Sequence, residues 1–293
     1  MAGRNTRAVD VLAPELATNG IGFGSDYHGH PHRPEGARLM LVDLAPRSEG
    51  PVAMPVLTLR DQTVVIIGGS SGIGHAVAEG ALAEGARVVI GSSSQARVDA
   101  AVQRLGAGAS GAVVDVQDEA SVAAFFGALE RFDHLVFTAG EPGGFAPVPL
   151  AQLDIAAAAE GLQVRFWGAL RVVKHAQPRL SAHGSITLTD GLLAHLPRKG
   201  IPLATAFAGA AEHLVRGLAV DLAPIRVNAV CPGPVLTERL AQLPAEMIRQ
   251  MTERQPLPRA AEPAEAAQAF LYLMRGSYTT GQVLIVDGGR MLV

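Results

Sequence analysis

The sequence has few of the features that disulfide cross-links, membrane spans and nucleic-acid binding require. It holds one cysteine, Cys231, which excludes an internal disulfide and suits a reducing compartment. No apolar run approaches the ~18 residues of a membrane span, and no apolar stretch near the N-terminus is typical of a signal peptide. The net charge is −3 with scattered basic residues, which argues against binding to nucleic acid or a membrane surface. We therefore expect a cytoplasmic protein.

Aromatic residues are also scarce, at 4% of the chain, while 48% of its residues are hydrophobic. Of three tyrosines, none lies between Tyr27 and Tyr272. The 293 residues suffice for one large α/β core built from small and branched side chains.

Residues 1–57 differ in composition from the rest. They contain six prolines and no sustained hydrophobic period, so we expect an N-terminal extension with a short strand at Leu39–Asp43 at most. His28, His30 and His32 alternate in it, a spacing that Zn²⁺ ligands can have. Because glycine and proline around them fix no geometry, we expect a histidine-rich loop and no metal site.

Residues 58–293 are expected to form a single dinucleotide-binding domain in which strands and helices alternate. The predicted strands are Val64–Ile67, Arg87–Ile90, Ala112–Asp115, Leu135–Thr138, Ser185–Thr189, Arg226–Val230 and Val283–Val286. The predicted helices are Ile73–Glu84, Gln95–Leu105, Glu119–Leu129, Ile155–His175, Thr205–Leu222, Thr237–Met251 and Ala264–Met274. This order predicts an α/β fold of the Rossmann type, a doubly wound seven-stranded parallel sheet with helices on both faces.

The first strand runs into a glycine-rich turn and then a helix. Its four β-branched residues suit a strand buried on both faces, and Gly68, Gly72 and Gly74 follow with the spacing Gly-x-x-x-Gly-x-Gly. A turn without side-chain bulk at a helix N-terminus lets backbone N–H groups approach a pyrophosphate. The sequence therefore predicts a dinucleotide site.

Further motifs follow in order along the chain. Phe137-Thr138-Ala139-Gly140 follows the fourth strand, Pro232-Gly233-Pro234 with Thr237 follows the sixth, and Asp287-Gly288-Gly289 follows the last. With the glycine turn, they resemble the short-chain dehydrogenases/reductases over roughly residues 58–293. The resemblance implies a nicotinamide dinucleotide held by Gly68, Ser70, Ser71, Gly72, Ile73, Gly74, Asp115, Val116, Ala139, Gly140, Pro232, Gly233, Val235 and Thr237.

The end of the second strand bears on the choice of cofactor. In place of an acidic residue that would accept from a ribose 2′-hydroxyl, the chain has Ser92, Ser93 and Ser94, with Arg97 nearby. Hydroxyls and a guanidinium suit a 2′-phosphate, which favours NADP(H) over NAD(H). Alternatively, Ser94 caps the next helix and the choice is relaxed.

The catalytic Asn-Ser-Tyr-Lys set of the family is missing. The resemblance places the four positions at Arg165, Gly191, Ala204 and Ala208. None of these side chains except arginine carries a polar group, so the usual tyrosine-lysine proton transfer is not expected.

Candidate substitutes for the missing catalytic groups lie in the loop after the predicted strand Ser185–Thr189. Asp190 and His195 are candidate acids or bases, because a partly desolvated carboxyl or imidazole can titrate near neutrality. The alternatives are a turn residue for Asp190, a loop histidine for His195 and a solvated charge for Lys199. Glu141, and Arg165 as a cation facing an anion or an ion-pair partner, are further candidates.

Three functions remain open. The first is an atypical NAD(P)(H)-dependent oxidoreductase acting on a small carbonyl, enone or alcohol. The second is a pseudoenzyme subunit. The third is a cyclase, dehydratase or isomerase in a pocket made roomier by Gly191, Ala204 and Ala208. The resemblance implies assembly into a homodimer or tetramer through the fourth and fifth helices, and small residues such as Gly209 and Gly217 would give a flat helix surface suited to close packing.

Overall fold

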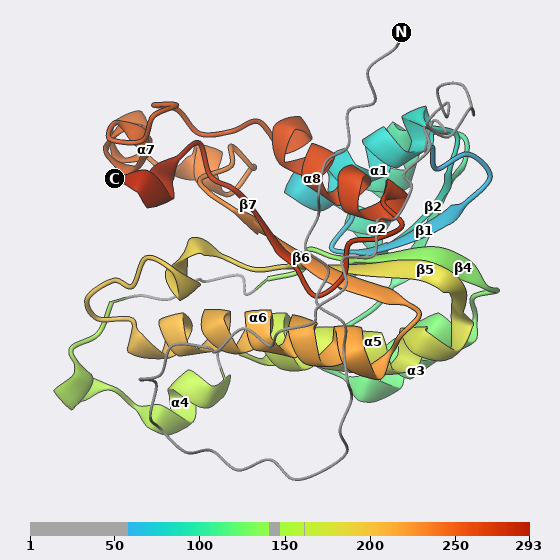
Figure 1. Ribbon diagram of the computed structural model, residues 1–293, viewed down its shortest axis with the longest axis horizontal. Helices are drawn as coiled ribbons and strands as arrows, with labels where there is room; N and C mark the ends of the chain where they lie inside the picture. The colour runs from blue at the N-terminus through green and yellow to red at the C-terminus, as the bar shows by residue number, and fades with distance from the viewer. Residues whose placement is uncertain (1–57, 141–146, 161) are drawn as a thin grey trace, which may run out of the picture. The chain divides into compact units, whose positions relative to one another are not determined.

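The computed structural model describes residues 58–140, 147–160 and 162–293 (Figure 1). The predicted extension, its strand at Leu39–Asp43 and its histidine loop lie outside the described residues, and so does Glu141. No helix in these three ranges is long and apolar enough to cross a membrane. Within the same ranges, no group of three or more His, Cys, Asp and Glu side chains is arranged to hold a metal ion.

Seven parallel strands form one sheet in the order β3-β2-β1-β4-β5-β6-β7. The order reverses direction between β1 and β4, where α/β folds bind their ligands. The strands are β1 (Thr63–Ile67), β2 (Arg87–Ser92), β3 (Ala109–Val113), β4 (Phe132–Phe137), β5 (Leu180–Thr189), β6 (Arg226–Pro232) and β7 (Val283–Val286). The predicted doubly wound α/β fold is thus confirmed.

Helices cover both faces of the sheet (Figure 1). On one face lie α1 (Gly72–Ala83), α2 (Gln95–Leu105) and α8 (Pro263–Arg275), and on the other α3 (Glu119–Gly127), α5 (Ala169–Ala176) and α6 (Pro202–Asp221). In β1, Val64 and Ile66 pack under the first group, whereas Val65 and Ile67 pack under the second. All four are 0–1% exposed, which is why this strand has no polar side.

Two predicted helices are interrupted. In place of one helix over Ile155–His175 the chain forms α4 (Ile155–Glu160), a π-helical segment at Gln163–Gly168, and α5. In place of Thr237–Met251 it forms a short 3₁₀ turn at Leu240–Gln242 and α7 (Ala245–Thr252). Pro244 explains the second break, since proline and its preceding residue oppose helix continuation. Strand β3 begins and ends earlier than the predicted Ala112–Asp115, because Asp115 belongs to a turn in which its carboxylate accepts from Gln117 N at 2.9 Å.

Candidate functional site

The glycine turn after β1 has no room for side chains. Gly68 has a φ of +94°, and a Cβ there would lie 2.6 Å from Ala139 N. At Gly74 a Cβ would lie 2.4 Å from the carbonyl oxygen of Gly68. Ser71 precedes α1 without a side-chain capping bond. The first backbone N–H groups of α1 are therefore left to water or to a bound anion.

Two distant loops meet at this turn. Gly72 has a φ of +54°, and a Cβ there would lie 3.0 Å from Thr237 Cγ2, so the loop after β6 reaches the start of α1. Thr237 Oγ1 also accepts from Leu240 N at 3.4 Å, a partial cap of the following turn. From the other side, Thr138 N donates to Ile67 O at 2.8 Å, which brings Ala139 and Gly140 beside Gly68.

Other predicted cofactor contacts have structural roles. Gly233 lies so near the end of β7 that a Cβ would be 2.8 Å from Asp287 Cα. Val235 is buried and its backbone bridges to Ala261. Val116 is buried too, and its Cγ2 would be 2.9 Å from a Cβ on Gly168. These residues shape the site through packing, whatever they bind.

Hydroxyls and guanidiniums gather at the end of β2. Ser70 Oγ donates to Ser92 Oγ at 3.0 Å, and Arg97 Nη2 donates weakly to Ser93 Oγ at 3.5 Å. Arg104 donates to Ser70 O at 3.0 Å. Ser94 is the N-cap residue of α2 but makes no side-chain capping bond. A dinucleotide with an extra phosphate fits this polar, cationic corner.

The four positions that the resemblance assigns to the family's catalytic set line one cavity, although they come from three separate segments. Arg165, Gly191, Ala204 and Ala208 all line it, with Asp190 among them. Its volume is only about 50 Å³, far below the ~300–1,000 Å³ typical of ligand sites. Phe207 lies in its wall and stacks edge-on with Phe166 at 5.9 Å. For the described residues, the predicted enlargement is wrong, because aromatic rings fill the space.

Arg165 spans the mouth of this cavity. Its Nη2 would be 2.6 Å from a Cβ on Gly140, and its Nη1 would be 3.7 Å from a Cβ on Gly191. It therefore bridges the ends of β4 and β5. Its segment is π-helical, a distortion that often occurs at functional sites.

Asp190 is buried at the carboxyl end of β5, with 2% of its surface exposed. Its backbone N donates to Val230 O at 2.9 Å, which continues the pairing with β6. Both carboxyl oxygens lack a partner in hydrogen-bonding geometry among the described residues. Burial raises the pKa of Asp190 to about 7 and the nearby Glu212 carboxylate adds to the rise, whereas the Gly191 N–H and Arg165 oppose it. A carboxyl with this pKa exchanges protons near neutrality.

Glu212 is the residue that sequence reasoning missed. It is 6% exposed on α6, and its Oε1 lies 2.5 Å from His195 Nε2. Arg216 Nη2 is 3.8 Å from its other oxygen. Counting along the helix would have found it, because residues 204, 208 and 212 recur every four residues and so share a face. The structure thus places His195 beside Glu212, whose carboxylate also helps to raise the pKa of Asp190.

Lys199 and Cys231 are not part of this cluster. Lys199 is exposed in the loop before α6, as a solvated charge would be. Cys231 is buried, and burial is the main cause that raises the pKa of its thiol to about 12. A thiol that keeps its proton in this way is a structural group.

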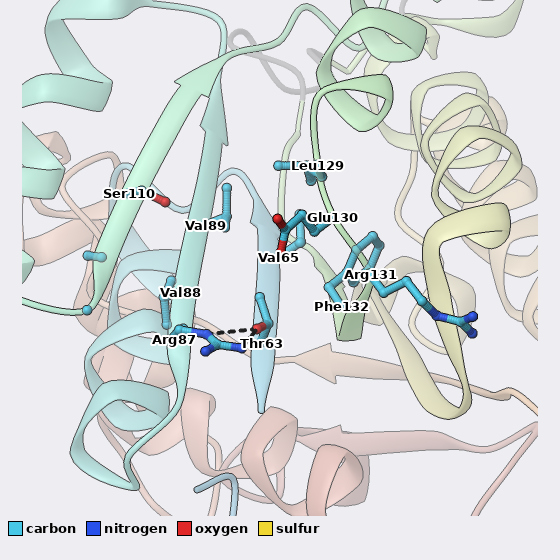
Figure 2. A pocket seen from close by; sticks show the side chains of 12 residues that line it. Thr63, Val65, Arg87, Val88, Val89, Ser110, Leu129, Glu130, Arg131 and Phe132 are labelled. Carbon is cyan, nitrogen blue, oxygen red and sulfur yellow. Dashed lines mark hydrogen bonds between the residues drawn. The ribbon is translucent and has the colours of Figure 1, made fainter. Parts of the chain in front are cut away.

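A larger cavity of about 450 Å³ lies at the opposite, amino ends of β1 to β4 (Figure 2). There Arg87 donates to Thr63 Oγ1 from Nε at 3.3 Å and from Nη2 at 3.1 Å. Neither the glycine turn nor the Asp190 cluster contributes to its lining. Its position excludes it from the site at the carboxyl ends of the strands.

Fold and site together define a dinucleotide-binding protein of the Rossmann class. The sequence model described as enoyl-(acyl carrier protein) reductase matches residues 68–290. The short-chain dehydrogenase/reductase ATR9 of Stachybotrys chlorohalonatus is 36% identical over 254 residues, which cover 80% of this chain and 99% of that protein. The chain belongs to the short-chain dehydrogenase/reductase family.

Solved structures agree with this assignment. MalC reductase/Diels-Alderase from Malbranchea aurantiaca is 32% identical with a TM-score of 0.74, over 80% of this chain and 98% of that one. A small-chain dehydrogenase in complex with NADPH is 31% identical with a TM-score of 0.67, over 80% of this chain and 100% of that one.

Proposed function

We propose that the protein is an NADP(H)-dependent oxidoreductase in which Asp190 takes over the proton transfer that tyrosine performs in related enzymes. Its substrate is a small organic carbonyl, enone or alcohol. The observation that carries the proposal is the buried carboxyl of Asp190, which lines one cavity with all four vacant catalytic positions. Its pKa, raised to about 7 chiefly by burial, suits this role.

The glycine turn, the serines after β2 and the loops after β4 and β6 would hold the dinucleotide. Arg97 and the hydroxyls of Ser93 and Ser94 support a preference for the 2′-phosphate of NADP(H), since the second strand ends without a carboxylate. The solved relative with NADPH supports the same choice. When bound, the dinucleotide supplies or accepts a hydride at the substrate carbon.

In the direction of reduction, protonated Asp190 donates its proton to the substrate oxygen as the carbonyl carbon becomes tetrahedral. The carbonyl thus gains one hydride and one proton and leaves as an alcohol. Arg165 keeps positive charge beside the oxygen, and His195, at 26% side-chain exposure, links Glu212 to solvent. A proton from solvent restores Asp190, and oxidation runs through the same groups in reverse.

A non-redox reaction is the second candidate. The relative MalC has both reductase and Diels-Alderase in its name, which supports a cyclase on this fold. A pseudoenzyme subunit is the third reading, because the ribose-binding lysine is replaced by Ala208. A cytoplasmic location remains part of the proposal.

We also propose a homodimer or tetramer through α4, α5 and α6. On α6, a Cβ added at Gly209 or Gly217 would meet nothing within 4 Å among the described residues beyond the helix's own backbone. Val220, on the same helix, is 82% exposed. A partner helix could approach this surface closely.

Calorimetric titration with NADPH, NADP⁺, NADH and NAD⁺ tests the first step. Under the proposal NADPH binds with a Kd in the micromolar range or below, about −8 kcal/mol, and a panel of ketones and enones then elicits NADPH oxidation. If NADPH binds but no compound of the panel elicits its oxidation, the cyclase function is favoured instead. Lack of binding by all four dinucleotides rejects the proposal.

A further inference from the structure

A separate cavity of about 310 Å³ lies beside the Asp190 cluster. Its walls are largely apolar and include Leu192, Leu196, Ile201 and Met251. Leu193 lines both this cavity and the smaller one that contains Asp190, so the two share a wall. The cavity also borders Pro232 and Gly233 at the end of β6, on the cofactor side of the fold.

Two cations face this apolar space from different parts of the chain. Arg198 comes from the loop before α6, and Arg290 comes from the C-terminal turn. No carboxylate stands among the described residues that line the cavity. Two guanidiniums of like charge repel each other unless an anion lies between them.

The charges around Arg290 offset the repulsion only in part. Burial and then Arg198 lower the pKa of Arg290, and the nearby Asp287 offsets this only in part. Asp287 is already engaged, since its two oxygens accept from Gly289 N and Met291 N at 2.8 Å each. Arg290 itself donates to the carbonyl oxygen of Met251. Among the described residues this is the only hydrogen bond that the Arg290 side chain donates, which leaves most of its five donors for a ligand.

We propose that this cavity binds a carboxylate of the substrate between Arg198 and Arg290, with the apolar body of the substrate against the leucine walls. The inference rests on the proposed function, since it names the class of compound that the Asp190 site would act on. Guanidiniums match planar carboxylates with paired hydrogen bonds. The reacting carbon then lies toward Leu193 and Asp190. The substrate class is a small hydrophobic carboxylic acid that also contains a ketone, enone or alcohol.

The test compares a charged probe with a neutral one of nearly the same shape. Cyclohexanecarboxylate and cyclohexanecarboxamide are titrated into the full-length protein in the presence of NADPH, by calorimetry. The variants are Arg198→Gln, Arg290→Gln and Arg290→Lys. Arg254→Gln is the control, because this exposed arginine lies outside the lining. Thermal unfolding and NADPH affinity show whether each variant is folded.

We expect the carboxylate to bind and the carboxamide to bind about tenfold more weakly or not at all. Each glutamine substitution weakens the carboxylate by about tenfold, Arg290→Lys by less, and Arg254→Gln leaves it unchanged. Equal binding of the two probes, or carboxylate binding insensitive to both arginines, overturns the inference. If NADPH binds while the carboxylate does not, the proposed function stands and the inference falls. If the carboxylate binds and NADPH does not, the inference stands and the proposed function falls.

Discussion

The site has two halves, one at the glycine turn and one at the four positions that the family resemblance assigns to catalysis, and they depend on different parts of the chain. Around the glycine turn, binding depends on backbone: Gly68 and Gly74 have no room for a Cβ, and the start of α1 has free N–H groups. Around the four positions that the family resemblance assigns to catalysis, function depends on side chains, and this chain has Arg165, Gly191, Ala204 and Ala208 there.

The difference shows what each kind of function tolerates. A pyrophosphate site made of backbone N–H groups is retained as long as the backbone keeps its conformation. A proton donor must be supplied by a side chain of suitable pKa, so its loss requires a substitute nearby. Asp190, whose pKa the nearby Glu212 carboxylate helps to raise, is a buried titratable group at that place.

The largest effect is expected from Asp190→Asn, which separates the two halves. The amide keeps the shape but donates no exchangeable acid proton, so kcat for carbonyl reduction falls by about 10²–10⁴. NADPH affinity stays within a factor of about two, since the dinucleotide half is untouched. Steady-state kinetics with calorimetry decide this. A variant with undiminished kcat would show that Asp190 is a turn residue.

Next in size is Gly72→Ala, which acts on the other half. The new methyl group would press on Thr237 at 3.0 Å, at a φ of +54°. We expect NADPH binding to weaken about tenfold or more. Gly106→Ala is the matched control, because its φ is +74° and a Cβ there meets no atom of the described residues within 4 Å. If both variants bind NADPH equally, the loop after β6 does not contribute to the pyrophosphate site.

A smaller effect concerns the choice between the two dinucleotides. Ser93→Asp places a carboxylate where the 2′-phosphate is expected, which repels NADPH and accepts from the 2′-hydroxyl of NADH. The ratio of NADPH to NADH affinity should fall about tenfold. Ser110→Asp adds the same charge to an exposed residue at the amino end of β3 and should leave the ratio unchanged. An unchanged ratio in Ser93→Asp would mean that specificity lies elsewhere.

The smallest effect is a shift in the pH profile by Glu212→Gln. In the wild type, reduction by protonated Asp190 should decline as pH rises through about 7, and oxidation should increase over the same range. Removing the Glu212 charge lowers the pKa of Asp190, so both inflections move to lower pH. Glu253→Gln, an exposed change on the surface, should not move them. If the inflections of Glu212→Gln do not move, the Glu212 charge does not influence the titration of Asp190.

The sequence predicted the fold correctly, whereas the individual dinucleotide contacts around the glycine turn stay a prediction. Alternating strands, the glycine spacing and the buried run of β1 report directly on local geometry. The four positions that the resemblance assigns to catalysis line one cavity, but their catalytic roles and those of Asp190 and His195 stay predictions. The proximity of Glu212 to Asp190 was not predicted, because it depends on how α6 packs against the end of β5. The π-helical segment at Arg165 was not predicted either, because its apolar spacing is also typical of an ordinary α-helix.

The most direct test of the account is the protonation state of Asp190 itself. Infrared difference spectra of the wild type against Asp190→Asn, in the presence of NADPH and at pH 5 to 9 in steps, isolate the signal of this carboxyl. The account predicts a protonated carboxyl band at low pH that disappears with a midpoint near 7. An ionised carboxylate at every pH in that range would contradict it, and the proton donor would have to be sought in another group.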